Sequence, residues 1–403
     1  MSDPTNIKNN EPEVDWAVFI PAVAVVLICA IPLMIYTETA SQLLADSRAL
    51  IMDNFLWLYL LVALAAFGFC MWLAFGRFGH VKLGAPDEPP EYSDTHWVAM
   101  MFTAAIGAAV LTWGFSEPIF YLQTPPLDIA VGSSKSFEWA HMYPLLHWGI
   151  VPWSIYAVPA VPIAYMLYVK RYKVLRISSA CDGALPNKGR NQIKTTIDIL
   201  IVLGIVGGVT TSLGLVVPML SAMLSTLFGI EDSMLIKMSV LALWTFLFGA
   251  SVYRGLKSGI KVLADINMVL AFLAVLFILI AGPGVFILDL TVNSIGLMFN
   301  NFISTATWTD PINNGGFPEA WTGFYWAWWL AYTGMIALFF GRISRGRTIR
   351  QLVLGVICWG CLGTWLVLAV MGGYSLYLES NGLLDVSNIL TTQGMSYVNA
   401  LVI

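Results

Sequence analysis

Residues 320–329 read AWTGFYWAWW, and a longer apolar segment continues after them. On a helix, Trp326 and Trp329 lie three residues apart and Trp328 and Tyr332 lie four apart, so each pair projects toward one region. Indole and phenol faces that converge in this way suit a cation without hydrogen-bond donors, such as a trimethylammonium group. Trp and Tyr also collect at membrane–water interfaces, so the spacing leaves a cation-binding cage and an interfacial belt both open.

The composition around this stretch excludes an ordinary soluble domain. Of the 403 residues, 58% are hydrophobic and only 11% are charged, and the mean hydropathy is +0.76. These values predict an all-α polytopic membrane protein. Nine apolar segments have the length of about 20 residues that a bilayer requires: approximately 16–37, 55–76, 97–121, 143–169, 196–228, 235–253, 266–289, 322–341 and 352–377.

The distribution of basic residues predicts the orientation of these spans. With a cytoplasmic N-terminus, 17 of the 20 Lys and Arg residues fall in inside segments, and only Arg48, Lys135 and Lys237 fall outside. This alternation follows the positive-inside rule. Four arginines in the loop 342–350 suit anionic lipid head groups or contact with another cytoplasmic segment. Residues 291–306 form either an amphipathic helix on the outer surface or a plain extracellular loop.

Two spans contain features of a transport site. The small residues between Thr103 and Ala109 allow the third span to unwind, as helices do around ion and substrate sites, or allow a neighbour to pack closely. Glu117, at the outer end of the same span, is a functional carboxylate or a group at the water boundary.

The fourth span carries a second aromatic set. Trp148 and Tyr156 lie about two helical turns apart, and this second set favours a cage over a belt. We interpret His147 as a hydrogen-bonded structural residue rather than a proton carrier. No cluster has metal-ligand spacing or a paired nucleophile and base, so we expect neither an enzyme nor a cofactor. Nothing in the composition points to a nucleic-acid partner.

Several motifs together make the chain resemble one transporter family. They are AWTGFYWAWW at 320–329, GRISRGRT at 341–348, HWGIVPWSIY at 147–156, WGFSEP at 113–118, TSLGL at 211–215 and DPINNGGFP at 310–318. From Asp15 onward the chain is similar to the betaine/choline/carnitine transporters (BCCT). The resemblance implies a twelve-span carrier with a leucine-transporter-like core of two inverted five-helix repeats. The family often forms homotrimers.

This resemblance implies a domain organisation. Residues 1–15 are a cytoplasmic tail, and 16–94 hold two peripheral spans. The first five-helix repeat, spans 3–7, occupies 95–290, and 291–321 form the extracellular loop. Residues 322–403 begin the second repeat with spans 8 and 9. The chain thus ends as if truncated after the ninth span, and a molecule that stopped at Ile403 is not expected to transport.

The resemblance also implies roles for individual residues. The family's aromatic box around the quaternary ammonium matches Trp148, Trp153, Tyr156 and Trp329, and a second aromatic group along the pathway matches Trp326, Trp328 and Tyr332. Sodium-coupled members carry a glycine-rich stretch in the third span, where this chain has AIGAA at 105–109. The implied sodium region comprises Thr103, Ile106 and Asn267. Sodium-independent carnitine exchangers have Arg at the position of Asn267, so Asn favours sodium coupling.

Together these observations predict a secondary carrier of the bacterial inner (plasma) membrane. Its substrate is a quaternary ammonium or related methylated osmolyte such as betaine, carnitine, choline or trimethylamine N-oxide. Symport with sodium by alternating access would drive uptake. The alternatives are a sodium-independent exchanger of carnitine type and a sensor that binds the ligand without moving it.

Overall fold

The computed structural model describes residues 14–172, 176–253 and 259–402, with the side chains at 108, 251–252, 259–265 and 267 also left out. The expected cytoplasmic tail, residues 1–15, lies almost entirely outside the described residues. Within the described part all regular secondary structure is helical, apart from one isolated β-bridge between Lys82 and Thr348. The predicted all-α architecture is therefore confirmed.

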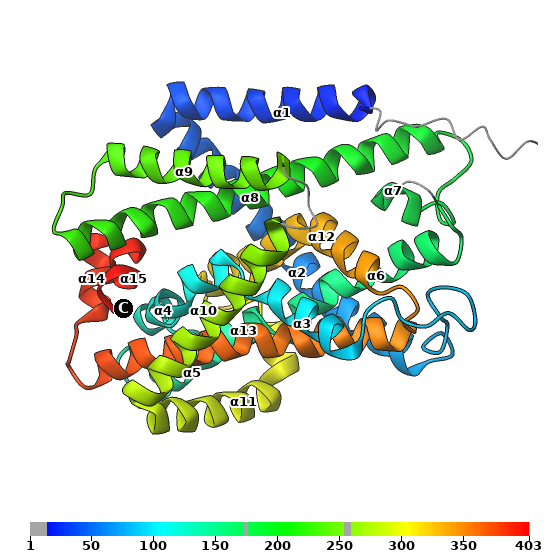
Figure 1. Cartoon of the computed structure of the whole chain (residues 1–403). Coiled ribbons are helices and arrows are strands. Elements are labelled where there is room, and N and C mark those ends of the chain that lie inside the picture. The colour runs from blue at the N-terminus through cyan, green and yellow to red at the C-terminus, as the bar shows by residue number, and fades with distance from the viewer. Residues whose placement is uncertain (1–13, 173–175, 254–258, 403) are drawn as a thin grey trace, which may run out of the picture.

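Every predicted span falls on helical residues, and three of the predicted spans are interrupted (Figure 1). The unbroken helices are α1 (Trp16–Ile35), α2 (Thr37–Phe75), α8 (Arg190–Phe228), α9 (Met234–Tyr253), α10 (Gly259–Ala281), α12 (Gly323–Ile343) and α13 (Ile349–Ser380). The third span consists of α3 (Asp94–Ala105) and α4 (Ala108–Gln123), and the fourth of α5 (Ser134–His147) and α6 (Ile150–Tyr168). Shorter elements are α7 (Ile177–Ala180), the π-helix η1 (Pro318–Thr322), α14 (Val386–Gln393) and α15 (Met395–Val402).

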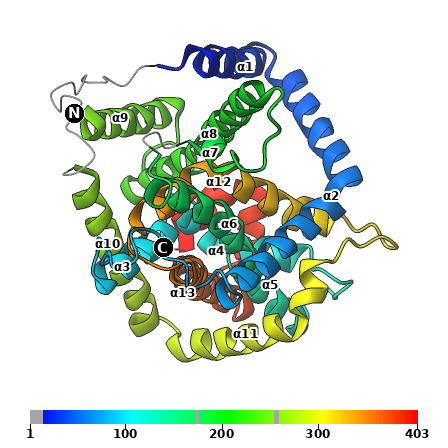
Figure 2. The ribbon, with the colours of Figure 1, turned by 90° about the vertical axis from the view of Figure 1, so that its right-hand side faces the viewer.

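A further helix, α11 (Gly284–Ala306), replaces the end of the predicted seventh span. We predicted that this span would reach residue 289, but α10 ends at Ala281 because Gly282 and Pro283 follow it, and proline has no backbone N–H for a helix interior. The segment 291–306, for which the sequence left a surface helix and a plain loop open, is thus helical and belongs to a helix that begins at Gly284. Figure 2 looks nearly along α13 but views α11 from the side, so the two helices cross steeply.

Length and composition alone support fewer membrane crossings than the nine predicted. Within the described residues, α1, α2, the α5–α6 run, α8, α11 and α13 are long and apolar enough to cross a membrane, and the pair α3–α4 adds a seventh span. The described apolar parts of α9 and α10 are shorter. The helix α12 is not in this set, because Trp and Tyr carry polar N–H and O–H groups that reduce its hydropathy.

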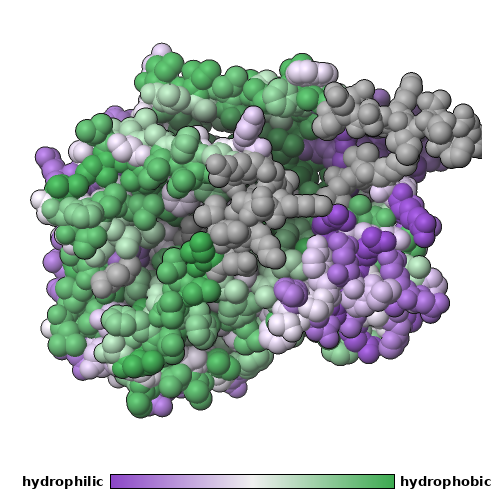
Figure 3. All heavy atoms as spheres, in the orientation of Figure 1, coloured by the Kyte–Doolittle hydropathy of each residue, from purple (hydrophilic) through white to green (hydrophobic). Residues whose placement is uncertain are grey.

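The core of the molecule is formed by α6, α12 and α13. Helix α6 packs against α12, α13 and α2, while α13 also packs against α3, α4 and α5. The outer helices α1, α9 and α10 present large apolar side chains outward, as helices facing lipid do. Figure 3 shows this apolar surface over most of the molecule, with hydrophilic residues gathered at the end that holds the α2–α3 loop.

At this hydrophilic end, the α2–α3 and α12–α13 loops interlock. Leu83 donates its backbone N–H to the carbonyl of Arg347 (2.8 Å), and Gly346 donates to the carbonyl of Leu83 (2.8 Å). The Arg347 side chain is only 4% exposed; it bonds Asp94 and lies 4.7 Å from the Trp97 ring centroid. Of the two readings of the arginine-rich loop, contact with another segment of the chain is therefore the one observed.

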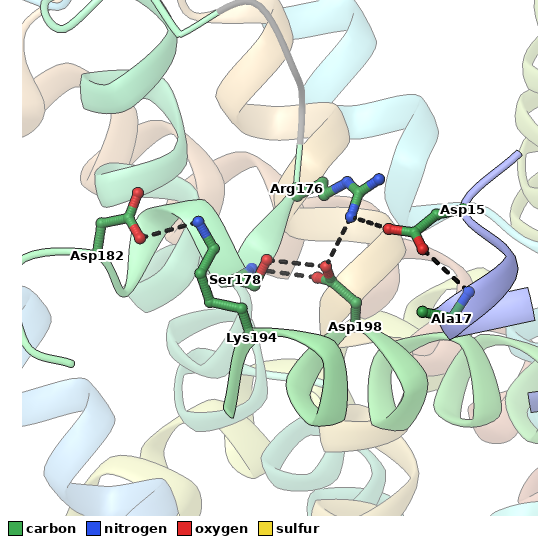
Figure 4. A network of polar contacts seen from close by, with 7 residues as sticks. All are labelled: Asp15, Ala17, Arg176, Ser178, Asp182, Lys194 and Asp198. Carbon is green, nitrogen blue, oxygen red and sulfur yellow. Dashed lines mark hydrogen bonds and ion pairs between the residues drawn. The ribbon is translucent and has the colours of Figure 1, made fainter. Parts of the chain in front are cut away.

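A second polar network lies where α1 begins (Figure 4). Arg176 donates to Asp15 (2.6 Å) and to Asp198 of α8 (3.5 Å), and Asp198 also accepts from the hydroxyl of Ser178 (2.9 Å). The hydrogen bond from Arg176 lowers the pKa of Asp15 from its ordinary value. This network connects the start of α1 to α7 and α8.

Candidate functional site

An aromatic cluster from α6, α12 and the break between α5 and α6 forms the centre of the candidate site. The Trp329 ring centroid lies 5.6 Å from that of Trp148, 5.2 Å from that of Trp153 and 4.8 Å from that of Tyr156. All four side chains are at least nine-tenths buried. We call these four residues the cage; they are the four that the family resemblance groups around the ammonium.

The helix break at Trp148 is stabilised by the cage's own neighbours. The Trp148 carbonyl accepts the Thr364 hydroxyl of α13 (2.6 Å) and the Trp153 indole N–H (3.2 Å). A carbonyl released from a helix inside a membrane needs such partners, because lipid offers none. The break therefore turns the Trp148 ring toward α12 without leaving this carbonyl unsatisfied.

Glycines on adjacent helices let two of the rings approach closely. A Cβ added at Gly360 of α13 would meet the Trp153 indole at 2.3 Å, and one at Gly208 of α8 would meet the Tyr332 ring at 2.8 Å. Both distances are far below van der Waals contact, so a larger residue would push each ring away. The Tyr332 hydroxyl also donates to the Gly208 carbonyl (2.7 Å), which fixes its position.

The cage opens onto a cavity of about 890 Å³ between α3, α4, α6, α8, α9, α12 and α13. Its volume lies in the range of small-molecule sites. Tyr332 and Trp328 line the cavity beside the cage, and Trp328 contacts Trp148 with ring centroids 5.8 Å apart. The lining residues in the described part of the chain are apolar, aromatic or hydroxyl-bearing, without Asp, Glu, Lys or Arg. Such a lining suits a methylated cationic group that is held by ring faces.

Trp326 lies apart from the other predicted aromatic residues. Its ring does not line the cavity; it contacts His147, with ring centroids 5.9 Å apart, and is fully buried. The structure therefore brings six of the seven predicted aromatic residues to the cavity and places Trp326 in the packed core behind them. The three-residue spacing predicted that Trp326 and Trp329 project toward one region, and it did not indicate that only Trp329 lines the cavity.

Glu117 and His147 form a buried polar network behind the cage. The Tyr121 hydroxyl donates to Glu117 Oε1 (2.7 Å), and the Trp148 indole N–H donates to Oε2 (2.9 Å). His147 Nδ1 lies 2.8 Å from the Tyr121 oxygen, and its Nε2 lies 3.1 Å from the Thr322 hydroxyl. Glu117 has no exposed surface, so it is not at a water boundary in this conformation. His147 is hydrogen-bonded through both ring nitrogens, as we expected of a structural residue.

The cavity also has lining residues that we did not predict. Among them are Thr364 of α13, and Trp244 and Phe248 of α9, whose rings stack with centroids 5.9 Å apart. The spacing of Trp244 and Phe248, four residues apart in a predicted span, was the available signal for this third aromatic set.

The predicted sodium region lies beside the cavity at the break between α3 and α4. The two helices are bent by 53° here, and Ile106 and Gly107 are the non-helical residues between them. The Thr103 hydroxyl donates to the Ala99 carbonyl (2.7 Å) and lies 3.2 Å from the Met268 sulfur of α10. The side chain of Asn267 lies outside the described residues, but its neighbour Met268 places this part of α10 against α3.

Comparisons with known proteins identify the family. Residues 17–402 match the model of "BCCT, betaine/carnitine/choline family transporter". The chain belongs to the BCCT family. It is also 36% identical, over 361 residues, to the glycine betaine transporter OpuD of Bacillus subtilis (strain 168). That match covers 89% of this chain and 70% of the relative.

Membership of the BCCT family agrees with the fold. A BCCT protein is a multi-pass membrane transporter, so the family and the relative point to transport and not to an enzyme. No group of three or more His, Cys, Asp or Glu side chains that could hold a metal ion occurs among the residues that the structure describes. A sodium site built from hydroxyl and carbonyl oxygens would not appear as such a group.

Proposed function

We propose that this BCCT protein takes up a quaternary ammonium or related methylated osmolyte, with glycine betaine as the first candidate, by symport with sodium. The observation that carries the proposal is the contact of Trp329 with three other rings, beside a cavity whose lining carries no charged side chain among the described residues. Each ring face contributes about 0.5–2 kcal/mol to binding a desolvated cation. Three or four faces would supply a useful share of the roughly 8 kcal/mol of micromolar affinity.

Alternating access would carry the substrate past this site. The cavity is lined by residues of the broken spans α3–α4 and α5–α6 and of the helices α8, α9, α12 and α13. In transporters with such interrupted helices, one bundle rocks against another around a fixed site. We place the N-terminus in the cytoplasm and the protein in the inner membrane, because this orientation puts the interlocked, arginine-rich loops on the positive-inside side.

The nearest alternative is exchange without sodium. The complete protein in liposomes should accumulate labelled glycine betaine under an inward sodium gradient and lose most of that uptake when potassium replaces sodium. Uptake that needs only internal substrate, whatever the cation, would favour the exchanger. The Asn267→Arg variant should reduce the sodium dependence of uptake while keeping substrate-driven exchange.

A sensor that binds the ligand without moving it is the second alternative. Saturable binding of glycine betaine together with an absence of both net flux and exchange in the complete protein would favour it. Competition by choline, carnitine and trimethylamine N-oxide against labelled betaine would then define which methylated head groups the cavity accepts.

A further inference from the structure

Glu117 is an acidic residue that bonds a member of the cage directly. It lies on α4, has no exposed surface, and accepts the indole N–H of Trp148 through Oε2 (2.9 Å). Its other oxygen accepts the Tyr121 hydroxyl (2.7 Å). Glu117 does not line the cavity, so one aromatic ring separates it from the space where a ligand would sit.

Among the residues that the structure describes, no Lys or Arg side chain pairs with this carboxyl group. Within the described part of the chain, its ion-pair contact is with His147, whose Nδ1 lies 3.7 Å from Oε1. The single proton of the Tyr121 hydroxyl is donated to Glu117. The bond between Tyr121 and His147 therefore requires a proton on His147 Nδ1, so that His147 donates to the Tyr121 oxygen. An acid in the bilayer interior is costly and normally has a function.

The bond to Glu117 distinguishes Trp148 from the other cage tryptophans. Of the other two, the Trp329 indole N–H has no hydrogen-bond partner among the described residues, and Trp153 donates to neutral oxygens. The same lack of a described partner holds for Trp328, which lines the cavity beside the cage. When an indole N–H donates to a carboxylate, the electron density of the indole ring increases. A negative charge behind the ring also adds to the attraction of a cation at its face, and this attraction is strong in a low dielectric.

We propose that Glu117 is a positioning and electrostatic residue of the cage. It fixes the plane of Trp148 and makes the cavity select a positively charged trimethylammonium over a neutral group of the same shape. This inference rests on the proposed function, because it assumes that the cage binds the methylated head group. It adds a source of charge selectivity to a cavity whose own described lining carries none.

The test compares glycine betaine with its carbon isostere 3,3-dimethylbutanoate, which has the same shape and carboxylate but no positive nitrogen. Binding of each to the complete protein in lipid nanodiscs is measured for the wild type, Glu117→Gln and Ser116→Ala. Gln keeps the size and an acceptor oxygen but removes the charge. The Ser116→Ala control alters a buried hydroxyl on the same helix that bonds Asn399 instead of the cage.

Glu117→Gln should weaken glycine betaine binding by about three- to tenfold, the size of one cation–π contact. Binding of the isostere should change less than about twofold, and the control should match the wild type. An unchanged betaine-to-isostere ratio in Glu117→Gln would overturn the inference while leaving the cage intact. A wild type that binds the two compounds equally would instead overturn the proposed function.

A second pair of variants covers the case in which Glu117→Gln does not fold. Trp148→Phe and Trp153→Phe each replace an indole by a weaker ring, but only Trp148→Phe also removes the link to Glu117. The betaine-to-isostere ratio should fall further in Trp148→Phe than in Trp153→Phe. Equal falls would contradict a special role of the carboxylate behind Trp148.

Discussion

Trp153 of α6 lies directly against Gly360 of α13, so closely that a Cβ at position 360 would come within 2.3 Å of the indole. The same ring contacts Trp329 of α12 with centroids 5.2 Å apart. The absence of a side chain at Gly360 therefore allows the Trp153 ring to lie where it does. This relationship links the packing of the core to the shape of the candidate site.

Gly360→Ala should displace Trp153 and weaken substrate binding. Overpacking in a well-packed region costs about 1–3 kcal/mol, and part of that cost should appear as an increase in KM of about tenfold. Uptake kinetics of the complete protein measure it. Gly296→Ala on α11, where an added Cβ meets nothing within 4 Å, is the matched control and should leave KM unchanged. Equal effects of both variants would contradict this relationship.

Trp329→Leu should remove a large part of substrate affinity because Trp329 is the ring that contacts the other three cage members. Loss of this face should raise KM by about tenfold or more, with expression intact. Trp57→Leu, at a half-exposed position on α2, provides the control. Unchanged uptake by the Trp329→Leu protein would show that the cage is not the binding site.

Trp326→Phe should affect stability rather than affinity. The Trp326 ring is fully buried beside His147 and does not line the cavity. The smaller ring leaves space in the core, so we expect a loss of about 1–2 kcal/mol in stability and a lower unfolding temperature, with KM close to the wild-type value. An increase in KM as large as that of Trp329→Leu would place Trp326 in the binding site after all.

Arg347→Ala should destabilise the interlocked loops. Its side chain is almost fully buried and donates to the Tyr92 carbonyl (2.8 Å) as well as to Asp94. Although the Asp94 side chain is exposed, the substitution empties the buried space that the Arg347 side chain fills beside Trp97 and leaves the partly buried Tyr92 carbonyl without its donor, at a cost of about 1–3 kcal/mol. Thermal unfolding in detergent measures the loss. Arg345→Ala removes a pair with Glu88 whose arginine is 48% exposed, and it should have little effect. The reverse order would contradict the buried role of Arg347.

The bond between Arg176 and Asp15 should resist mild acid but not salt. The pKa of Asp15 is lowered from the ordinary value of 3.8, so its contribution is present above that value and is lost only as the pH falls through the lower folded pKa. Between pH 5 and 8 the contact should persist, while high ionic strength should screen it because both side chains are more than a third exposed. Hydrogen exchange of the backbone amides at the start of α1 measures the effect of pH and the effect of salt. The Arg176→Ala variant shows the exchange expected when the contact is broken. A lower protection factor of these amides at pH 5 than at pH 8, both in low salt, would contradict this prediction.

Sequence patterns predicted the helices better than their ends. The apolar segments located α1, α8 and α13 because hydrophobic length alone decides whether a helix can cross a bilayer. The end of α10 at Ala281 was missed because the apolar composition continues through Gly282 and Pro283 into α11. The division into inverted repeats stays a prediction, since it depends on family resemblance.

The candidate site was predicted in its residue types but not in all of its geometry. Trp148, Trp153, Tyr156 and Trp329 were grouped by resemblance, and the structure places them in contact. The bond between Glu117 and Trp148 could not be foreseen, because 31 residues separate them and no local pattern records which donor reaches a buried acid. Trp244 and Phe248 had a visible i, i+4 spacing, yet nothing local to α9 indicated that this helix lines the cavity.

By itself, the sequence determined that this protein is helical, embedded in a membrane and rich in aromatic faces, because composition and periodicity act locally along each helix. Only the tertiary structure decided which faces share a cavity. Trp326 and Trp329 differ by about 4.5 Å along one helix axis, and that offset places one ring against His147 and the other in the cage. The difference arises from the neighbouring helices: His147 at the end of α5 packs against Trp326, while Trp153 and Tyr156 of α6 meet Trp329 at the edge of the cavity.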